Sequence, residues 1–209
     1  MKSLNSLFRL GWVLLVLTGL VGCRTQPPPA EGNSNWAQQR QQLEYLQGWQ
    51  LRGRVNVRYE NESHTPRIQW QQQGEEYLIR LWGTFNAGNT RISGGAHRVT
   101  LEQKGDVHTA SSPEDLILEY LGYELPVSYL RYWVRGLPVA DSAAELQFNS
   151  LNQLVGFTQE GWIVSYEDLR QYGEVNLPRR VEVSYPEREI RLRFIGLAWN
   201  LDDLDDINE

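Results

Sequence analysis

The chain is short of reactive and metal-binding side chains. It contains one cysteine and three histidines among 209 residues. A single cysteine excludes an intrachain disulfide, so stability must come from packing, to which eight Trp and ten Tyr contribute large apolar surfaces. His64, His97 and His108 lack the paired spacing of a metal site. Neither a Gly-x-Ser-x-Gly elbow nor a phosphate-binding glycine loop occurs. We therefore expect no enzyme, no metal and no cofactor.

Positive charge is also scarce. Lys and Arg total 20 against 26 Asp and Glu, which gives a formal net charge of −6. A nucleic-acid partner is therefore not expected, because phosphate binding needs a clustered positive surface. The acidic residues between Asp202 and Asp206 lack the glycine turn and the spaced oxygen ligands of a calcium loop. We interpret residues 200–209 as a solvated acidic tail.

Residues 1–22 have the layout of a secretory signal. Lys2 and Arg9 supply a positive start, and the apolar stretch Leu10–Leu20 precedes the small residue Gly22. The apolar stretch is shorter than the roughly 20 residues that span a bilayer comfortably. The alternatives are an ordinary signal peptide with an incidental cysteine, or an N-terminal membrane anchor.

The sequence Leu20-Val21-Gly22-Cys23 resembles a bacterial lipobox, in which the cysteine sulfur receives a diacylglyceryl group. Lipidation is therefore predicted at Cys23. Arg24 follows, whereas many lipoproteins kept in the inner membrane have Asp at that position, so the outer membrane is favoured. Residues 23–35 include Pro27-Pro28-Pro29 and are predicted to be a tether, stiff at first and then flexible. Residues 36–199 are predicted to form the folded domain.

Hydrophobic periodicity predicts a helix followed by many short strands. Apolar residues at helical spacing predict a helix over 36–47, and from Trp49 the period changes to two. The same alternation predicts strands near 49–59, 67–71, 77–82, 91–93, 98–103, 107–110, 145–148, 155–158, 162–166, 180–185 and 189–194. Residues 61–66 are predicted to be a turn and 168–176 a loop.

Two helices interrupt the strands. Ser112 and Pro113 mark a helix start, Leu116, Leu118 and Leu121 form its apolar side, and Gly122 fits a C-terminal cap. A second helix is predicted over 126–134, stopped by a Gly-Leu-Pro sequence.

A long antiparallel meander has to close or be covered, because bare edges invite pairing with other chains. The predicted fold is mainly β with helices: an incomplete, half-open antiparallel β-barrel whose helical lid or plug encloses an apolar cavity. Candidates for the cavity lining are Val55, Val57, Ile68, Trp70, Tyr77, Ile79, Leu81, Leu118, Trp133, Trp162 and Tyr166. Taken singly, the aromatic residues among them are also what an ordinary core contains.

Phe85 occupies an unusual place for a large apolar residue. It lies at a predicted turn tip flanked by Gly83 and Gly88, and turn tips are usually polar because their backbone faces water. Its side chain either folds back onto the barrel or projects outward toward a membrane or partner, and the pattern alone leaves both possibilities open.

Three sequence blocks resemble the LolB family of outer-membrane lipoprotein receptors. They are Ser112-Pro113-Glu114-Asp115-Leu116, Leu121-Gly122-Tyr123-Glu124-Leu125-Pro126-Val127 and Leu130-Arg131-Tyr132-Trp133-Val134-Arg135-Gly136-Leu137-Pro138. Gly53-Arg54, Trp70 before a Gln run, the turn over 83–88, and Trp162 with Tyr166 agree. The resemblance covers roughly residues 49–194.

The resemblance implies an incomplete barrel with an internal helical lid and an apolar cavity. It implies an activity without nucleotide: lipoproteins are accepted from the periplasmic carrier LolA and inserted into outer-membrane lipid. A protruding leucine of the family aids membrane insertion, and Phe85 stands at its position, which favours an outward side chain. We expect a periplasm-facing monomer anchored by lipid at the bacterial outer membrane. The alternatives are a structural scaffold lipoprotein with a filled barrel and, more remotely, a lipid hydrolase.

Overall fold

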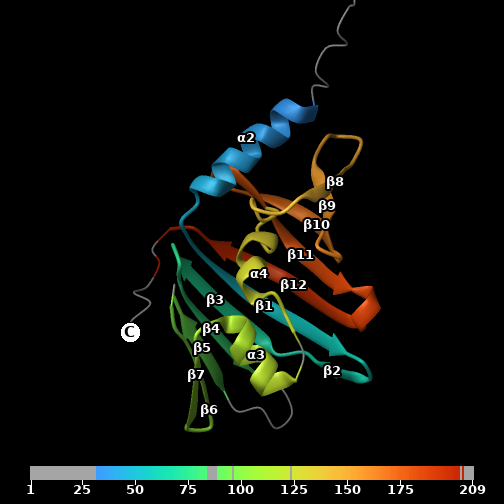
Figure 1. The fold of residues 1–209 in the computed structure, drawn as a ribbon. Helices are drawn as coiled ribbons and strands as arrows, with labels where there is room; N and C mark the ends of the chain where they lie inside the picture. Colours follow the sequence, from blue (N-terminus) through green and yellow to red (C-terminus); the bar gives the residue numbers. More distant parts are fainter. Residues whose placement is uncertain (1–31, 84–88, 96, 123, 203, 205–209) are drawn as a thin grey trace, which may run out of the picture. The chain divides into compact units, whose positions relative to one another are not determined.

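The computed structural model describes residues 32–83, 89–95, 97–122, 124–202 and 204 (Figure 1). Residues 32–209 form one folding unit, distinct from residues 1–31, and this unit contains the whole sheet and its core. The predicted signal segment, Cys23, Phe85 and Gly88 lie outside the described residues, as does most of the tether over 23–35 and of the acidic tail over 200–209. The predicted domain boundaries remain predictions.

The fold is built on one antiparallel sheet of twelve strands. The strands are β1 (Gly48–Tyr59), β2 (Glu62–His64), β3 (Arg67–Gln73), β4 (Glu76–Trp82), β5 (Thr90–Gly94), β6 (Val99–Gln103), β7 (Asp106–Ala110), β8 (Ala144–Phe148), β9 (Leu154–Gln159), β10 (Trp162–Tyr172), β11 (Val175–Tyr185) and β12 (Ile190–Asn200). Their order is β7-β6-β5-β4-β3-β1-β12-β11-β10-β9-β8, with β2 paired to β1 alone. Two meanders are thus joined by the pairing of β1 with β12.

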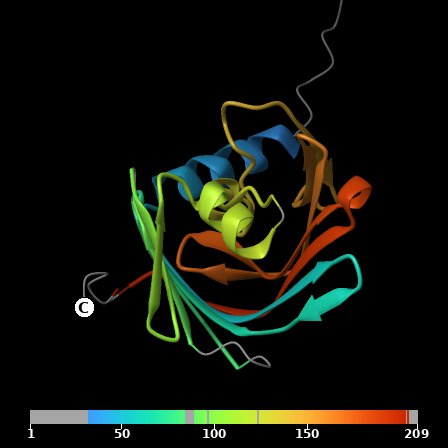
Figure 2. The ribbon, with the colours of Figure 1, turned by 60° about the horizontal axis from the view of Figure 1, so that its bottom comes forward.

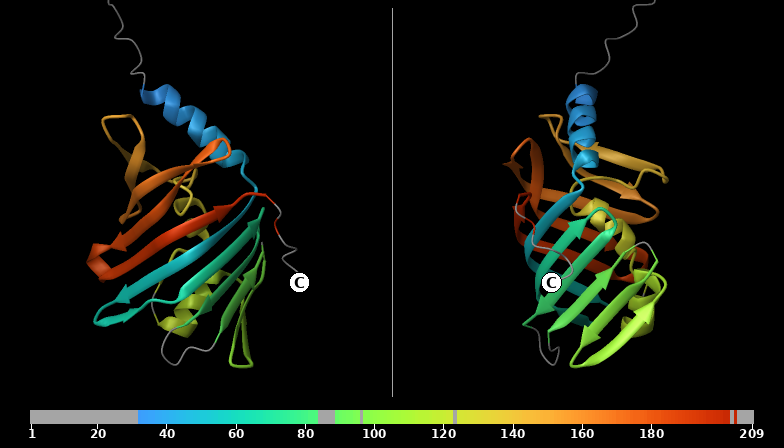
Figure 3. Two further views of the ribbon diagram at one scale, coloured as in Figure 1. Left: turned by 180° about the vertical axis from the view of Figure 1, so that it is seen from behind. Right: turned by 90° about the vertical axis from the view of Figure 1, so that its left-hand side faces the viewer.

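The sheet curls around the two short helices over residues 113–121 and 127–133, which lie on its concave side, whereas the helix over residues 32–45 lies at one end of the sheet (Figures 2 and 3). Strands β7 and β8 are its two edges, so the barrel is open. The predicted fold class, a half-open antiparallel barrel with internal helices, is confirmed. The register of β1 on β12 shifts at Gly53, where two residues of β12, Gly196 and Leu197, lie opposite one residue of β1. A Cβ at Gly53 would lie 2.9 Å from the carbonyl oxygen of Ile195, so a larger residue does not fit there unless the backbone shifts.

The described helices are α2 (Gly32–Tyr45), α3 (Pro113–Leu121), α4 (Val127–Trp133) and the 3-10 turn η1 (Pro186–Arg188). Among them, α3 has a capping residue at each end. The Ser112 hydroxyl accepts a hydrogen bond from the Asp115 amide at 3.1 Å, and Gly122 closes α3 with a φ of 79°. The N-cap and C-cap predicted for this helix are confirmed, since the left-handed conformation favours glycine.

Three details of the sequence prediction are wrong. Residues 61–66 are not only a turn, because β2 occupies 62–64 and pairs with β1. Residues 168–176 are not a loop: β10 continues to Tyr172 and β11 begins at Val175. The buried side of α3 consists of Leu116 and Ile117, whereas Leu118 is 44% exposed. A nine-residue helix places i+2 on a different face from i, so Leu116 and Leu118 cannot share one partner.

Candidate functional site

The concave face of the sheet carries the site predicted from alternation. Eight of the eleven candidate side chains are buried in one hydrophobic cluster: Val55, Ile68, Trp70, Tyr77, Ile79, Trp133, Trp162 and Tyr166. Val57 and Leu81 pack against this cluster and are partly buried. Leu118 is exposed and does not belong to this cluster. Because side chains alternate across a strand, the candidates of β1, β3 and β4 meet on one face of the sheet.

Trp133 of α4 is the centre of this cluster and is fully buried. Its indole Nε1–H donates to Gln159 Oε1 at 3.0 Å, and its backbone carbonyl accepts from the Tyr166 hydroxyl at 2.8 Å. Its ring lies 5.9 Å from that of Trp162 and 6.3 Å from that of Phe157. The end of α4 is therefore fixed to β9 and β10 by both polar and apolar contacts.

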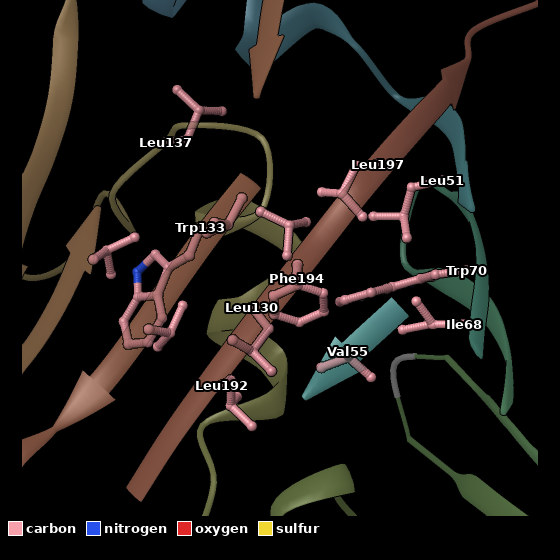
Figure 4. Close-up of a cluster of buried hydrophobic side chains, with 14 of the residues drawn as sticks. Leu51, Val55, Ile68, Trp70, Leu130, Trp133, Leu137, Leu192, Phe194 and Leu197 are labelled. Atoms are coloured by element: carbon pink, nitrogen blue, oxygen red, sulfur yellow. The ribbon is translucent and has the colours of Figure 1, made fainter. Parts of the chain in front are cut away.

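The enclosed apolar cavity expected from the sequence is filled in this conformation. Figure 4 shows Leu130 and Trp133 of α4 among the side chains of the sheet, with Phe194 and Val55 close by. All four belong to the buried core. Side chains of the helix thus occupy the space where bound apolar groups were expected to lie.

Two of the pockets beside α3 and α4 are lined by aromatic candidates. One, of about 250 Å³, is lined by Trp70, Gln72, Glu75, Tyr77, Gly95, Ser111, Ser112, Pro113, Glu114, Val127, Ser128 and Arg131. The other, of about 390 Å³, is lined by Glu114, Asp115, Leu118, Glu124, Leu125, Pro126, Glu160, Trp162, Tyr185 and Arg188. Four predicted candidates, Trp70, Tyr77, Leu118 and Trp162, therefore line an opening beside these helices.

Sequence reasoning missed two buried polar residues that hold the helices in place. Gln159 is 1% exposed; its amide nitrogen donates to the carbonyls of Val139 and Ser142, and its oxygen accepts from the Val139 amide as well as from Trp133. It fixes the segment that follows α4. A buried glutamine at the end of an alternating strand carries no sequence signal that sets it apart from a surface residue.

The second missed residue is Arg135, which is 7% exposed. It donates to the Arg131 carbonyl at 2.9 Å and packs 5.9 Å above the Trp49 ring. Its Nη1 donates to the carbonyls of Leu43 and Leu46 at the end of α2. Burial lowers the pKa of Arg135 to about 10, so it remains a cation at neutral pH.

Within the described part of the chain, two features of other protein classes are absent. No group of three His, Cys, Asp or Glu side chains is placed to bind a metal ion. No helix there has the length and apolar content to cross a membrane. Phe85 and Cys23 fall outside the described residues, so their predicted roles are untested by the structure.

Comparison with known proteins identifies the family. The family model described as outer membrane lipoprotein LolB matches residues 47–199. The outer-membrane lipoprotein LolB of Chromohalobacter salexigens is 33% identical over 194 residues, covering 91% of this chain and 90% of that protein. LolB of Stutzerimonas stutzeri is 36% identical over 179 residues, covering 83% and 87%. A crystal structure of a LolA superfamily protein from Nitrosomonas europaea aligns with a TM-score of 0.49 and 9% identity, covering 80% of this chain and 96% of that one. The chain therefore belongs to the outer-membrane lipoprotein LolB family.

Proposed function

We propose that this protein receives lipoproteins from the periplasmic carrier LolA and inserts them into the outer membrane. The observation that carries this proposal is family membership, because curated LolB proteins match nearly the whole chain at 33–36% identity. As a member of that family the protein is an outer-membrane lipoprotein. LolB is a lipoprotein-localisation family and not a known family of enzymes.

The acyl-binding site is the concave face of the sheet beneath α4. Acyl chains would take the place of Leu130 and Trp133, whose side chains now lie in the buried core with Val55 and Phe194. Each methylene moved from water into apolar surroundings contributes about 0.8 kcal/mol. Acyl contacts can therefore offset the helix contacts that they replace, and no nucleotide is needed. A difference of about 1.4 kcal/mol in affinity between carrier and receptor biases transfer about tenfold.

Two residues outside the described part of the chain complete the proposal. Cys23 carries the lipid anchor, and each acyl methylene in the bilayer adds about 0.8 kcal/mol to membrane binding. Phe85 enters the membrane surface during delivery. The anchor keeps the domain near the bilayer, while acceptance of the client depends on the folded unit alone.

A transfer assay tests the proposal. Residues 24–209, which contain the whole folding unit, are mixed with a radiolabelled lipoprotein bound to LolA, without ATP. We expect the label to co-purify with this protein. Label that stays on the carrier would contradict the receptor function and favour the alternative, a scaffold lipoprotein with a filled barrel.

A further inference from the structure

Two buried polar atoms without a hydrogen-bond partner line the same pocket. They are the Tyr77 hydroxyl oxygen and Arg131 Nε, the only buried side-chain nitrogen and oxygen atoms in the described part of the chain that lack one. Both residues line the pocket of about 250 Å³ between the start of β4 and the start of α4. An unsatisfied buried donor is costly, so two such donors on residues that line one pocket favour a ligand that supplies an acceptor there.

The position of the Tyr77 hydroxyl depends on a glycine. Tyr77 is 9% exposed and is paired across the sheet with Gly94. A Cβ at Gly94 would lie 2.5 Å from the hydroxyl oxygen, so any other residue would displace the ring. Burial, and next the neighbouring Glu114 carboxylate, raise the pKa of Tyr77 far above its ordinary value. The hydroxyl is therefore a neutral donor at any physiological pH.

Several other polar groups around the pocket are already engaged. Arg131 Nη2 donates to the Tyr132 hydroxyl at 2.9 Å, which orients the guanidinium and leaves Nε–H available. Glu114 Oε1 accepts from the Ser128 amide at 2.7 Å, and Gln72 bridges Trp70 Nε1 to the Gly74 carbonyl. The two available groups can both donate, so the matching ligand presents an oxygen acceptor.

The charges and the walls of the pocket narrow the class of ligand. Glu75 and Glu114 bring two carboxylates against the single cation of Arg131, which disfavours an anion such as a free fatty acid or a phosphate. Trp70, Pro113 and Val127 supply apolar wall next to the donors. The volume of about 250 Å³ far exceeds the roughly 30 Å³ share of one water molecule.

We propose that Tyr77 and Arg131 bind the uncharged ester or amide carbonyl of an acylated group, beside the hydrophobic face that receives its chain. This inference rests on the proposed function, since it names the part of the lipid anchor that the receptor recognises. Donors that are already desolvated in the unliganded protein favour the bound state, because binding makes the hydrogen bond without a further desolvation cost for the donor. The two donors should therefore bind an acylated glycerol or an acylated amine more tightly than a free fatty acid.

The experiment compares two ligands of equal chain length by calorimetry on residues 24–209: decanoyl glycerol and sodium decanoate. We expect the ester to bind more tightly than the acid. Tyr77→Phe keeps the ring over Gly94 and should lower ester affinity about tenfold, with an unchanged or higher Tm because a buried unsatisfied hydroxyl is removed. Arg131→Lys removes Nε–H, keeps the charge, and should also weaken ester binding. Tyr129→Phe, on α4 but outside the pocket lining, should change neither affinity.

Equal ester affinity in wild type and in both Tyr77→Phe and Arg131→Lys would mean that the pocket holds water only, and would overturn the inference. Tighter binding of decanoate than of the ester would also overturn it. Acceptance of lipoprotein from LolA is measured on the same samples. Normal acceptance with unchanged ester affinity would leave the proposed function intact and reject only the carbonyl site, whereas failure of wild type to accept lipoprotein would reject the proposed function itself.

Discussion

The guanidinium Nη1 of Arg135 lies 3.0 Å from the carbonyl oxygen of Leu43, and thereby ties the residues after α4 to the end of α2. The last carbonyls of a helix have no partner within the helix, and a cation there also complements the helix dipole. Arg135→Ala should therefore lower the free energy of unfolding by about 3 kcal/mol, measured by urea titration. Arg40→Ala, which removes an exposed pair with Glu44, should change it by less than about 0.5 kcal/mol. Equal effects of the two substitutions would contradict this role for Arg135.

Gln159 should be the most sensitive glutamine of the chain. Gln159→Leu leaves Trp133 Nε1 and the carbonyls of Val139 and Ser142 without their buried partner. We expect a loss of about 3 kcal/mol or more in the free energy of unfolding. Gln41→Leu, at an exposed position of α2, is the matched control and should be near neutral. A mild effect at Gln159 would indicate that water replaces the amide.

The buried hydroxyl of Tyr166 has a hydrogen-bond partner, whereas that of Tyr77 has none. The Tyr166 hydrogen bond to the Trp133 carbonyl is satisfied and buried, so Tyr166→Phe should destabilise the fold by about 1 kcal/mol. Tyr77→Phe should not destabilise it. Thermal unfolding of the two variants side by side measures the difference, and the opposite order would show that the hydroxyl environments are assigned wrongly.

The free energy of unfolding should depend on pH in the acid range because of Asp168. The hydrogen bond from Arg170, at 2.7 Å, is the main cause that lowers the pKa of the Asp168 carboxyl, and the charge of Arg179 acts in the same direction. A carboxyl whose pKa is lower in the folded state contributes stability above its unfolded pKa, near 4, and loses it as pH falls through the folded value. Asp168→Asn should therefore be less stable than wild type at pH 7 and approach it near pH 3.

The substitution at Asp168 is chosen to isolate charge. Asp168 has a φ of 55°, a left-handed conformation that asparagine tolerates well, so Asp168→Asn keeps the backbone geometry. Urea titrations at both pH values measure the difference. If the free energies of unfolding of variant and wild type differ by the same amount at pH 3 and pH 7, this ion pair is not the source of the difference.

The proposed insertion role of Phe85 has its own test. Phe85→Glu should leave acceptance of lipoprotein from LolA intact and block delivery to liposomes, because a charge resists burial among acyl chains. Phe85→Leu, which keeps an apolar tip, should deliver normally. Loss of acceptance in Phe85→Glu would instead place this side chain in the core of the domain.

The strands on the concave face could be predicted because burial repeats there every second residue, as from Leu51 to Val55 and from Ile68 to Trp70. The loop predicted over 168–176 is wrong because alternating burial is missing there. The second half of β10, after Tyr166, is exposed or only partly buried on both faces, so no hydrophobic alternation marks it as a strand. This half of β10 pairs with β11 through backbone hydrogen bonds, which do not require a particular pattern of side chains in the sequence.

The site was predicted as a set of apolar residues, and most of them are buried together. Its polar part could not be predicted. Arg135 contacts Leu43, and Gln159 contacts Trp133, only after residues distant in the sequence are brought together. The filled cavity has a similar origin, since the sequence gives the apolar character of Leu130 and Trp133 but not the depth to which α4 sits.

The pairing of β1 with β12 has a consequence for biogenesis. Gln50 is opposite Asn200, so the seam that unites the two meanders joins nearly the first and the last residues of the domain. Closing so long a loop is slow compared with forming either meander from neighbouring strands. A chain that emerges from the translocon N-terminus first cannot complete this seam until its final strand has crossed. Until then β1 lacks the partner strand that joins the two meanders.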